Sequence, residues 1–79
     1  MTQITTNLFV FFSSEGDEPS KVTEKLAMLG FTPHQGSADY VYHWQKKPTL
    51  DELLLTADRI THILKGSRVN FNIETNQER

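Results

Sequence analysis

The sequence contains no cysteine, and this absence removes several kinds of chemistry from consideration. Without thiols the chain forms no disulfide bond, offers no thiolate to a metal ion and has no cysteine nucleophile. The absence is also typical of proteins from a reducing compartment, so we predict a cytoplasmic protein. No motif indicates a cofactor, and none is predicted.

Long hydrophobic runs and an excess of positive charge are also missing. The longest apolar run has five residues, Leu8 to Phe12, whereas a membrane-spanning helix needs about 20. The N-terminal residues lack the basic start and apolar stretch of a signal peptide, so we expect a soluble protein that is not exported by that route. A formal net charge of -2 argues against nucleic acid, because phosphate binding depends on clustered Lys and Arg.

The 79 residues and the 37% hydrophobic content are those of one small globular domain. We assign the whole chain, residues 1–79, to this domain, with an ordered core of about residues 4–75 and a frayed end over residues 76–79. A chain of this size buries only about 60% of the surface that it exposes when unfolded, so each apolar side chain matters for stability.

The first half of the chain predicts a strand, a helix and a hairpin. Residues 4–13 are rich in β-branched and aromatic side chains and end in turn formers. Residues 19–29 have the apolar spacing of a helix, and Gly30 is placed to close it. In residues 31–44, a turn at Gly36 and Ser37 aligns one aromatic face that we assign to the core. That face consists of Phe31, Pro33, Tyr40, Tyr42 and Trp44.

The second half predicts a helix and a last strand. Thr49 and Glu52 have the spacing of a capping box, and the helix stops at Gly66. Its apolar stripe, which we assign to the core, consists of Leu50, Leu53, Leu54, Ala57, Ile60 and Leu64. Residues 67–74 alternate between apolar and polar side chains, as a strand with one buried face does.

The resulting order, βαββαβ, resembles the ferredoxin-like split βαβ arrangement. This resemblance implies a two-layer α+β sandwich with an antiparallel sheet of order 4-1-3-2 and both helices on one face. Pro33 then lies on an edge strand, which suits a residue without an amide hydrogen. The fold hosts many unrelated functions, so it does not by itself indicate an activity.

The unbroken apolar run in the first strand leads to the main functional hypothesis. Because the two helices cover one face only, some of these side chains must point to the open face, and we expect Phe9 and Phe11 to do so. An apolar patch with a polar rim is the usual mark of an interaction surface. We therefore predict an interaction or regulatory module that forms a homodimer through this face or binds another protein. The predicted interface residues are Phe9, Phe11, Val41, His43, Asn70 and Asn72.

Three alternatives are left open. The N-terminal or C-terminal segment of the chain can cover Phe9 and Phe11, or the two rings can be tolerated as scattered surface residues, so that no partner is needed. Single-stranded RNA can stack its bases on the same two rings. Thirdly, His34 lies opposite Asp39 in the predicted hairpin. The carboxylate can then orient the imidazole as a general base, and Ser13 or Ser14 can serve as the nucleophile. The third alternative makes the protein an acid/base enzyme, and His34 and Asp39 are its candidate catalytic residues.

No metal site is predicted. His34 and Asp39 offer two ligands where a catalytic zinc site uses three. The acidic residues Glu15, Asp17 and Glu18 precede the first helix, where carboxylates favour the positive end of the helix dipole without any ion.

Overall fold

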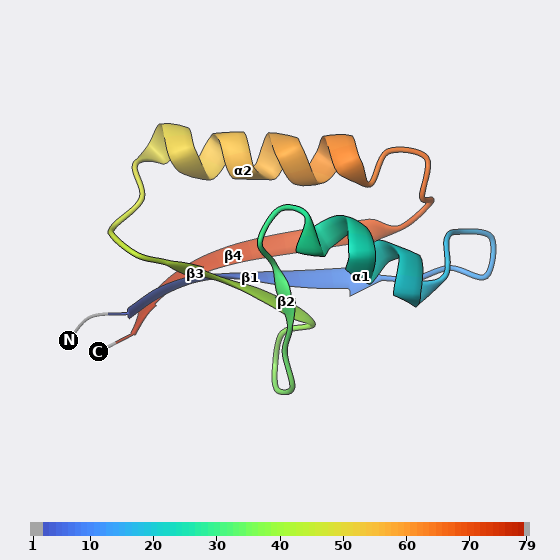
Figure 1. Ribbon diagram of the computed structural model, residues 1–79, viewed down its shortest axis with the longest axis horizontal. Helices are drawn as coiled ribbons and strands as arrows, with labels where there is room; N and C mark the ends of the chain where they lie inside the picture. The colour runs from blue at the N-terminus through green and yellow to red at the C-terminus, as the bar shows by residue number, and fades with distance from the viewer. Residues whose placement is uncertain (1–2, 79) are drawn as a thin grey trace.

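The computed structural model describes residues 3–78 as an α+β domain (Figure 1). Residues 1, 2 and 79 of the predicted domain lie outside the described residues. The predicted order of strands and helices is confirmed. The elements are β1 (Gln3–Phe11), α1 (Pro19–Ala27), β2 (Thr32–Pro33), β3 (Tyr40–Trp44), α2 (Leu50–Ile63) and β4 (Asn70–Glu78).

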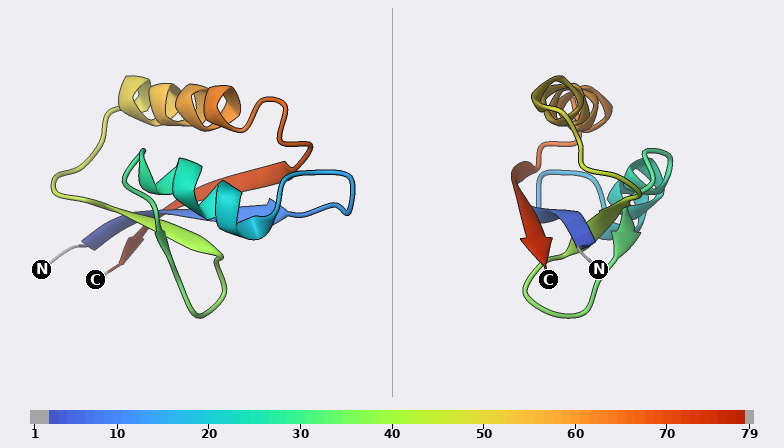
Figure 2. Two further views of the ribbon diagram at one scale, coloured as in Figure 1. Left: turned by 45° about the vertical axis from the view of Figure 1, so that its right-hand side comes forward. Right: turned by 90° about the vertical axis from the view of Figure 1, so that its left-hand side faces the viewer.

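The four strands form one antiparallel sheet in the order β2-β3-β1-β4. This is the predicted order read from the opposite edge. The central strand β1 pairs with β4 along its whole length and with β3 from Ile4 to Leu8. Both helices lie on the same side of the sheet, and this is visible in Figure 1 and from two other directions in Figure 2.

The hairpin of β2 and β3 has the predicted register. Thr32 lies opposite Val41 and Pro33 lies opposite Tyr40. One step further, the amide of His34 donates to the carbonyl of Asp39 at 2.9 Å. The strand with Pro33 is an edge strand, so the missing amide hydrogen of proline costs no ladder bond.

Helix α1 begins at Pro19 and ends at Ala27, slightly before the predicted end. Its apolar face buries Val22 and Leu26. Gly30 has a φ of 94°, which glycine adopts without the steric cost that other residues incur. The amide of Phe31 then donates to the carbonyl of Leu26 at 3.1 Å, so the chain folds back on the end of the helix.

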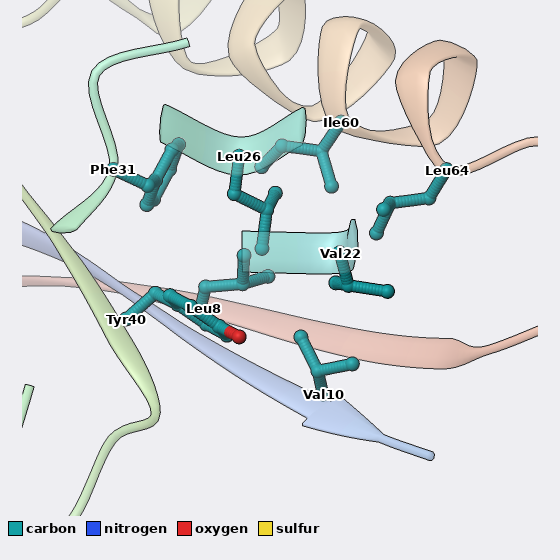
Figure 3. Close-up of a cluster of buried hydrophobic side chains, with 8 residues drawn as sticks. All are labelled: Leu8, Val10, Val22, Leu26, Phe31, Tyr40, Ile60 and Leu64. Atoms are coloured by element: carbon teal, nitrogen blue, oxygen red, sulfur yellow. The ribbon is translucent and has the colours of Figure 1, made fainter. Parts of the chain in front are cut away.

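The core lies between the sheet and the two helices. It is formed by eight buried side chains, Leu8, Val10, Val22, Leu26, Phe31, Tyr40, Ile60 and Leu64 (Figure 3). The predicted aromatic face is confirmed for Phe31 and Tyr40, while Tyr42 and Trp44 are half-buried and Pro33 is exposed.

Helix α2 has the predicted capping box but not the predicted orientation. The Thr49 hydroxyl accepts from the amide of Glu52 at 3.1 Å, and the Glu52 carboxylate accepts from the amide of Thr49 at 2.9 Å. Of the predicted stripe only Ile60 and Leu64 are buried, whereas Leu50 is 70% and Leu54 is 55% exposed. Figure 2 shows the cause, because the helix passes above the sheet at a distance and approaches the core only in its second half.

Strand β4 lies later in the chain than predicted. It begins at Asn70 and continues to Glu78, so residues 76–78, which we expected to fray, pair with residues 3–5 of β1. The reason is the length of β1, which provides backbone partners from Gln3 onwards. The prediction for residue 79 lies outside the described residues.

Within residues 3–78, neither helix has the length and apolar character that crossing a membrane requires.

Candidate functional site

The open face of the sheet is the side away from the helices. Leu8 and Val10 point into the core (Figure 3). Because side chains alternate along a strand, Phe9 and Phe11 point to the open face, as predicted. Phe9 is half-buried, and Phe11 is 60% exposed.

Strand β4 supplies the polar neighbours of these two rings. Asn72 lies opposite Phe9, and Asn70 lies opposite Phe11. Both asparagines are exposed, and their positions in the strand place them on the open face. We call this surface the Phe9–Phe11 patch and define it by Phe9, Phe11, Asn70 and Asn72.

The connection between β2 and β3 covers another part of the open face. Figure 1 and Figure 2 show this connection on the side of the sheet opposite the helices. Beneath it Val41 is only 4% exposed, which leaves this predicted interface residue little surface for a partner. A shallow groove of about 160 Å³ between the connection and the strands is lined by Gln3, Thr5, Asn7, His34, Ser37, Ala38, Val41 and His43.

His43 stays exposed at the rim of this groove. Its Nδ1 atom lies 3.2 Å from Nε2 of Gln3, so the two side chains are within hydrogen-bond distance. Of the six predicted interface residues, four therefore form the Phe9–Phe11 patch, while Val41 and His43 belong to the neighbouring groove.

The side chains of His34 and Asp39 are not hydrogen-bonded to each other, and Asp39 has another partner. Asp39 Oδ2 accepts from the backbone amide of Val10 at 2.9 Å, so the carboxylate extends the pairing of β1. Ser13 Oγ accepts from the amide of Glu15 at 3.0 Å, as in an ordinary turn.

Another polar cluster joins the β1–α1 loop to the α2–β4 loop. Lys25 Nζ donates to Asp17 Oδ2 at 2.9 Å and to Ser67 Oγ at 2.7 Å. Ser67 Oγ in turn donates to Asp17 Oδ2 at 2.9 Å. The hydrogen bonds from Lys25 and Ser67 lower the pKa of Asp17 below its ordinary value of 3.8.

This cluster holds the two loops together. The amide of Asp17 donates to the carbonyl of Ser67 at 2.9 Å. A Cβ atom at Gly16 would lie 2.5 Å from the same carbonyl oxygen, so only glycine allows the loops to approach this closely. Ser67 is fully buried, and a hydroxyl without solvent access has no route to a substrate. We therefore interpret the cluster as structural.

The sequence does not indicate this cluster, and Asp17 has only the pattern of a carboxylate before a helix. Lys25 lies on α1, and Ser67 follows Gly66 in what was predicted to be the last strand. The one feature of the sequence that could have indicated the cluster is Ser67, a small polar residue directly after Gly66.

Within residues 3–78, no group of three or more His, Asp or Glu side chains is arranged to hold a metal ion. Glu15 and Glu18 are exposed, and Asp17 is bound to Lys25 and Ser67.

Comparison with known proteins found no matching family model, no similar curated protein and no similar solved structure.

Proposed function

We propose that the protein is a ferredoxin-like interaction module that forms a homodimer through the Phe9–Phe11 patch. The observation that supports this proposal is the 60% exposure of the Phe11 ring on a sheet face that no helix covers. The cytoplasmic location stays a prediction from composition alone.

The energetic reason is the cost of leaving aromatic rings in water. Burying one Phe side chain stabilises by about 1.5 to 3 kcal/mol, and a small domain has a total stability of only about 5 to 15 kcal/mol. In a two-fold dimer both copies use the same patch, so each ring of the patch is buried in both copies and contributes twice to the free energy of association.

The charge of the patch also supports a second copy as the partner. Phe9 and Phe11 are flanked by Asn70 and Asn72, whose amide groups both donate and accept hydrogen bonds. Two copies of a neutral surface approach without electrostatic repulsion, and each asparagine can find a partner across the two-fold axis. Glu74 on β4 is the charged side chain that follows Asn72 in this row of the open face.

The same charge pattern argues against single-stranded RNA. Binding of single strands combines stacking on aromatic rings with a positively charged groove along the backbone. The strand residues that face the open side between Gln3 and Asn76 include no Lys and no Arg. The strands that carry the two rings therefore supply no cation on this face to neutralise phosphate.

Sedimentation velocity of the purified protein at increasing concentration tests the proposal. We expect the wild type to form a dimer and the combined Phe9→Ser and Phe11→Ser variant to be a monomer. The matched control is Met28→Ser, which changes an apolar residue that is 80% exposed in the turn after α1. This control should dimerise like the wild type.

Two results would contradict the proposal. A wild type that sediments as a monomer in the high micromolar range would remove the homodimer. A dimer that survives the double substitution would place the interface elsewhere. Circular dichroism of each variant shows that the fold is intact, so a loss of dimer is not confused with unfolding.

A further inference from the structure

A cleft lies under the first half of α2, on the helix side of the sheet and away from the Phe9–Phe11 patch. Its volume is about 200 Å³. It exists because α2 contacts the core only through its second half, which leaves the helix raised above the end of β3. The apolar wall consists of Leu29, Tyr42, Trp44 and Leu55.

The aromatic part of this wall is held in place. The rings of Tyr42 and Trp44 meet edge to face with centroids 4.8 Å apart. Trp44 Nε1 donates to the Thr6 hydroxyl at 2.8 Å, and that hydroxyl lies 2.7 Å from the hydroxyl of Thr75. Both rings are only half-buried, so they present a fixed apolar surface to whatever enters the cleft.

Two side chains of opposite charge complete the lining, Glu52 and Arg59. Glu52 Oε1 accepts from the amide of Thr49, which fixes the carboxylate and leaves its second oxygen able to accept. Among the described side chains of residues 3–76 the one ion pair joins Lys25 to Asp17, so neither Glu52 nor Arg59 forms an ion pair there. Thr56 also lines the cleft, but its hydroxyl donates to the carbonyl of Glu52.

We infer that this cleft binds a free α-amino acid with an apolar side chain. A cavity of about 150 Å³ holds one benzene ring, so this space suits a single aromatic or branched aliphatic group. The guanidinium of Arg59 matches a carboxylate, which it can bind with two parallel hydrogen bonds. The carboxylate of Glu52 matches an ammonium group. A zwitterion with an apolar side chain is the small ligand that matches the apolar wall, the guanidinium of Arg59 and the carboxylate of Glu52 together.

The intrinsic fluorescence of Trp44 provides the readout, because it is the single tryptophan of the chain and lies in the wall of the cleft. We expect a saturable change on titration with L-leucine or L-phenylalanine. The analogues 4-methylpentanoate, which lacks the ammonium group, and 3-methylbutylamine, which lacks the carboxylate, should each bind about tenfold more weakly or worse.

Two variants assign the roles of the charged residues. Arg59→Gln and Glu52→Gln should each weaken L-leucine binding by about tenfold or more. Glutamine at position 52 can still accept from Thr49, so the cap is kept. Lys47→Gln removes an exposed charge outside the cleft and should leave the affinity unchanged.

The inference is overturned if neither amino acid produces a saturable fluorescence change at concentrations up to about 10 mM. This is the weakest dissociation constant that the usual binding free energy per non-hydrogen atom gives for ligands of this size. It is also overturned if 4-methylpentanoate binds as tightly as L-leucine. Since the cleft and the Phe9–Phe11 patch are on opposite sides of the sheet, the Phe9→Ser and Phe11→Ser variant should bind L-leucine normally, and dimerisation and binding are tested separately.

Discussion

Among single residues, Asp17 has the clearest effect on how stability depends on pH. Lys25 and Ser67 both stabilise its charged form, so the pKa of Asp17 is lower in the folded protein than its ordinary value of 3.8. The unfolded chain lacks these bonds. The resulting contribution to folding is complete above the ordinary pKa and is lost as the pH falls through the lower pKa of the folded state.

We predict that Asp17→Asn lowers the melting temperature at neutral pH, because the charge that binds Lys25 is removed. The difference between wild type and variant should shrink as the pH is lowered from about 5 to about 2. Thermal unfolding followed by circular dichroism at several pH values measures both effects. Glu24→Gln, which removes an exposed carboxylate on α1, serves as the control. A constant difference between wild type and Asp17→Asn over this pH range would contradict the assignment.

This contact also marks a limit of sequence reasoning at the scale of residues. Asp17 and Ser67 are 50 positions apart, and nothing in their immediate neighbours indicates that they meet. Asp39 gives the same lesson. It was paired with His34 from the hairpin register, and the register is confirmed. Its carboxylate nevertheless binds the amide of Val10, because β1 runs alongside and offers a free donor.

At the scale of elements, α2 shows most clearly how packing overrides a periodic pattern. Leu54 and Ile60 belong to one predicted stripe, but Leu54 is 55% exposed and Ile60 is fully buried. The same kind of truncation should therefore have very different costs at the two positions.

We predict that Ile60→Ala lowers the free energy of unfolding by about 2 to 5 kcal/mol. Leu54→Ala should change it by about 0.5 kcal/mol or less, as surface substitutions usually do. Urea denaturation of both variants gives the comparison. Equal losses would mean that the helix packs through the predicted stripe after all.

The pattern failed on α2 because the helix carries apolar residues on more than one side. Leu55 and Ile63 lie outside the predicted stripe, yet Ile63 packs against the core while Leu50 does not. The start of the helix was predicted correctly, since capping by Thr49 depends on local chemistry, whereas the helix ends at Ile63, before the predicted stop at Gly66. Its rotation about its own axis depends on the sheet below, which the helix sequence does not encode by itself.

At the scale of the whole molecule, stability is distributed unevenly between the centre and the rim. β1 pairs on both sides and supplies Leu8 and Val10 to the core. β2 has only two residues, and the first half of α2 has few buried contacts. Local opening should therefore begin at the hairpin and at the start of α2.

We predict that amide hydrogen exchange is slowest for residues 6–10 of β1 and fastest for residues 35–37 of the hairpin connection. Residues 51–54 of α2 should exchange faster than residues 60–63 of the same helix, because only the latter are anchored in the core. Exchange followed by nuclear magnetic resonance resolves these segments. Uniform protection along α2 would contradict the raised position of its first half.

The strand order and the hairpin register were predictable because they depend on periodicity, on turn residues and on the handedness of connections. The position of the hairpin connection was not. It lies beside Val41, and Gly36 within it has a φ of 148°, which the hairpin register does not specify. The Phe9–Phe11 patch was therefore found from the sequence, whereas the groove beside it and the cleft under α2 required the arrangement in space.

The two edges of the sheet differ in their capacity to accept another strand. β2 is short and contains Pro33, which has no amide hydrogen to offer. β4 has nine residues, and no other strand within residues 3–78 pairs with its outer side. Backbone pairing between molecules is therefore open along one margin and blocked along the other, so a ladder built in this way closes after two sheets have joined and does not lengthen into a fibre.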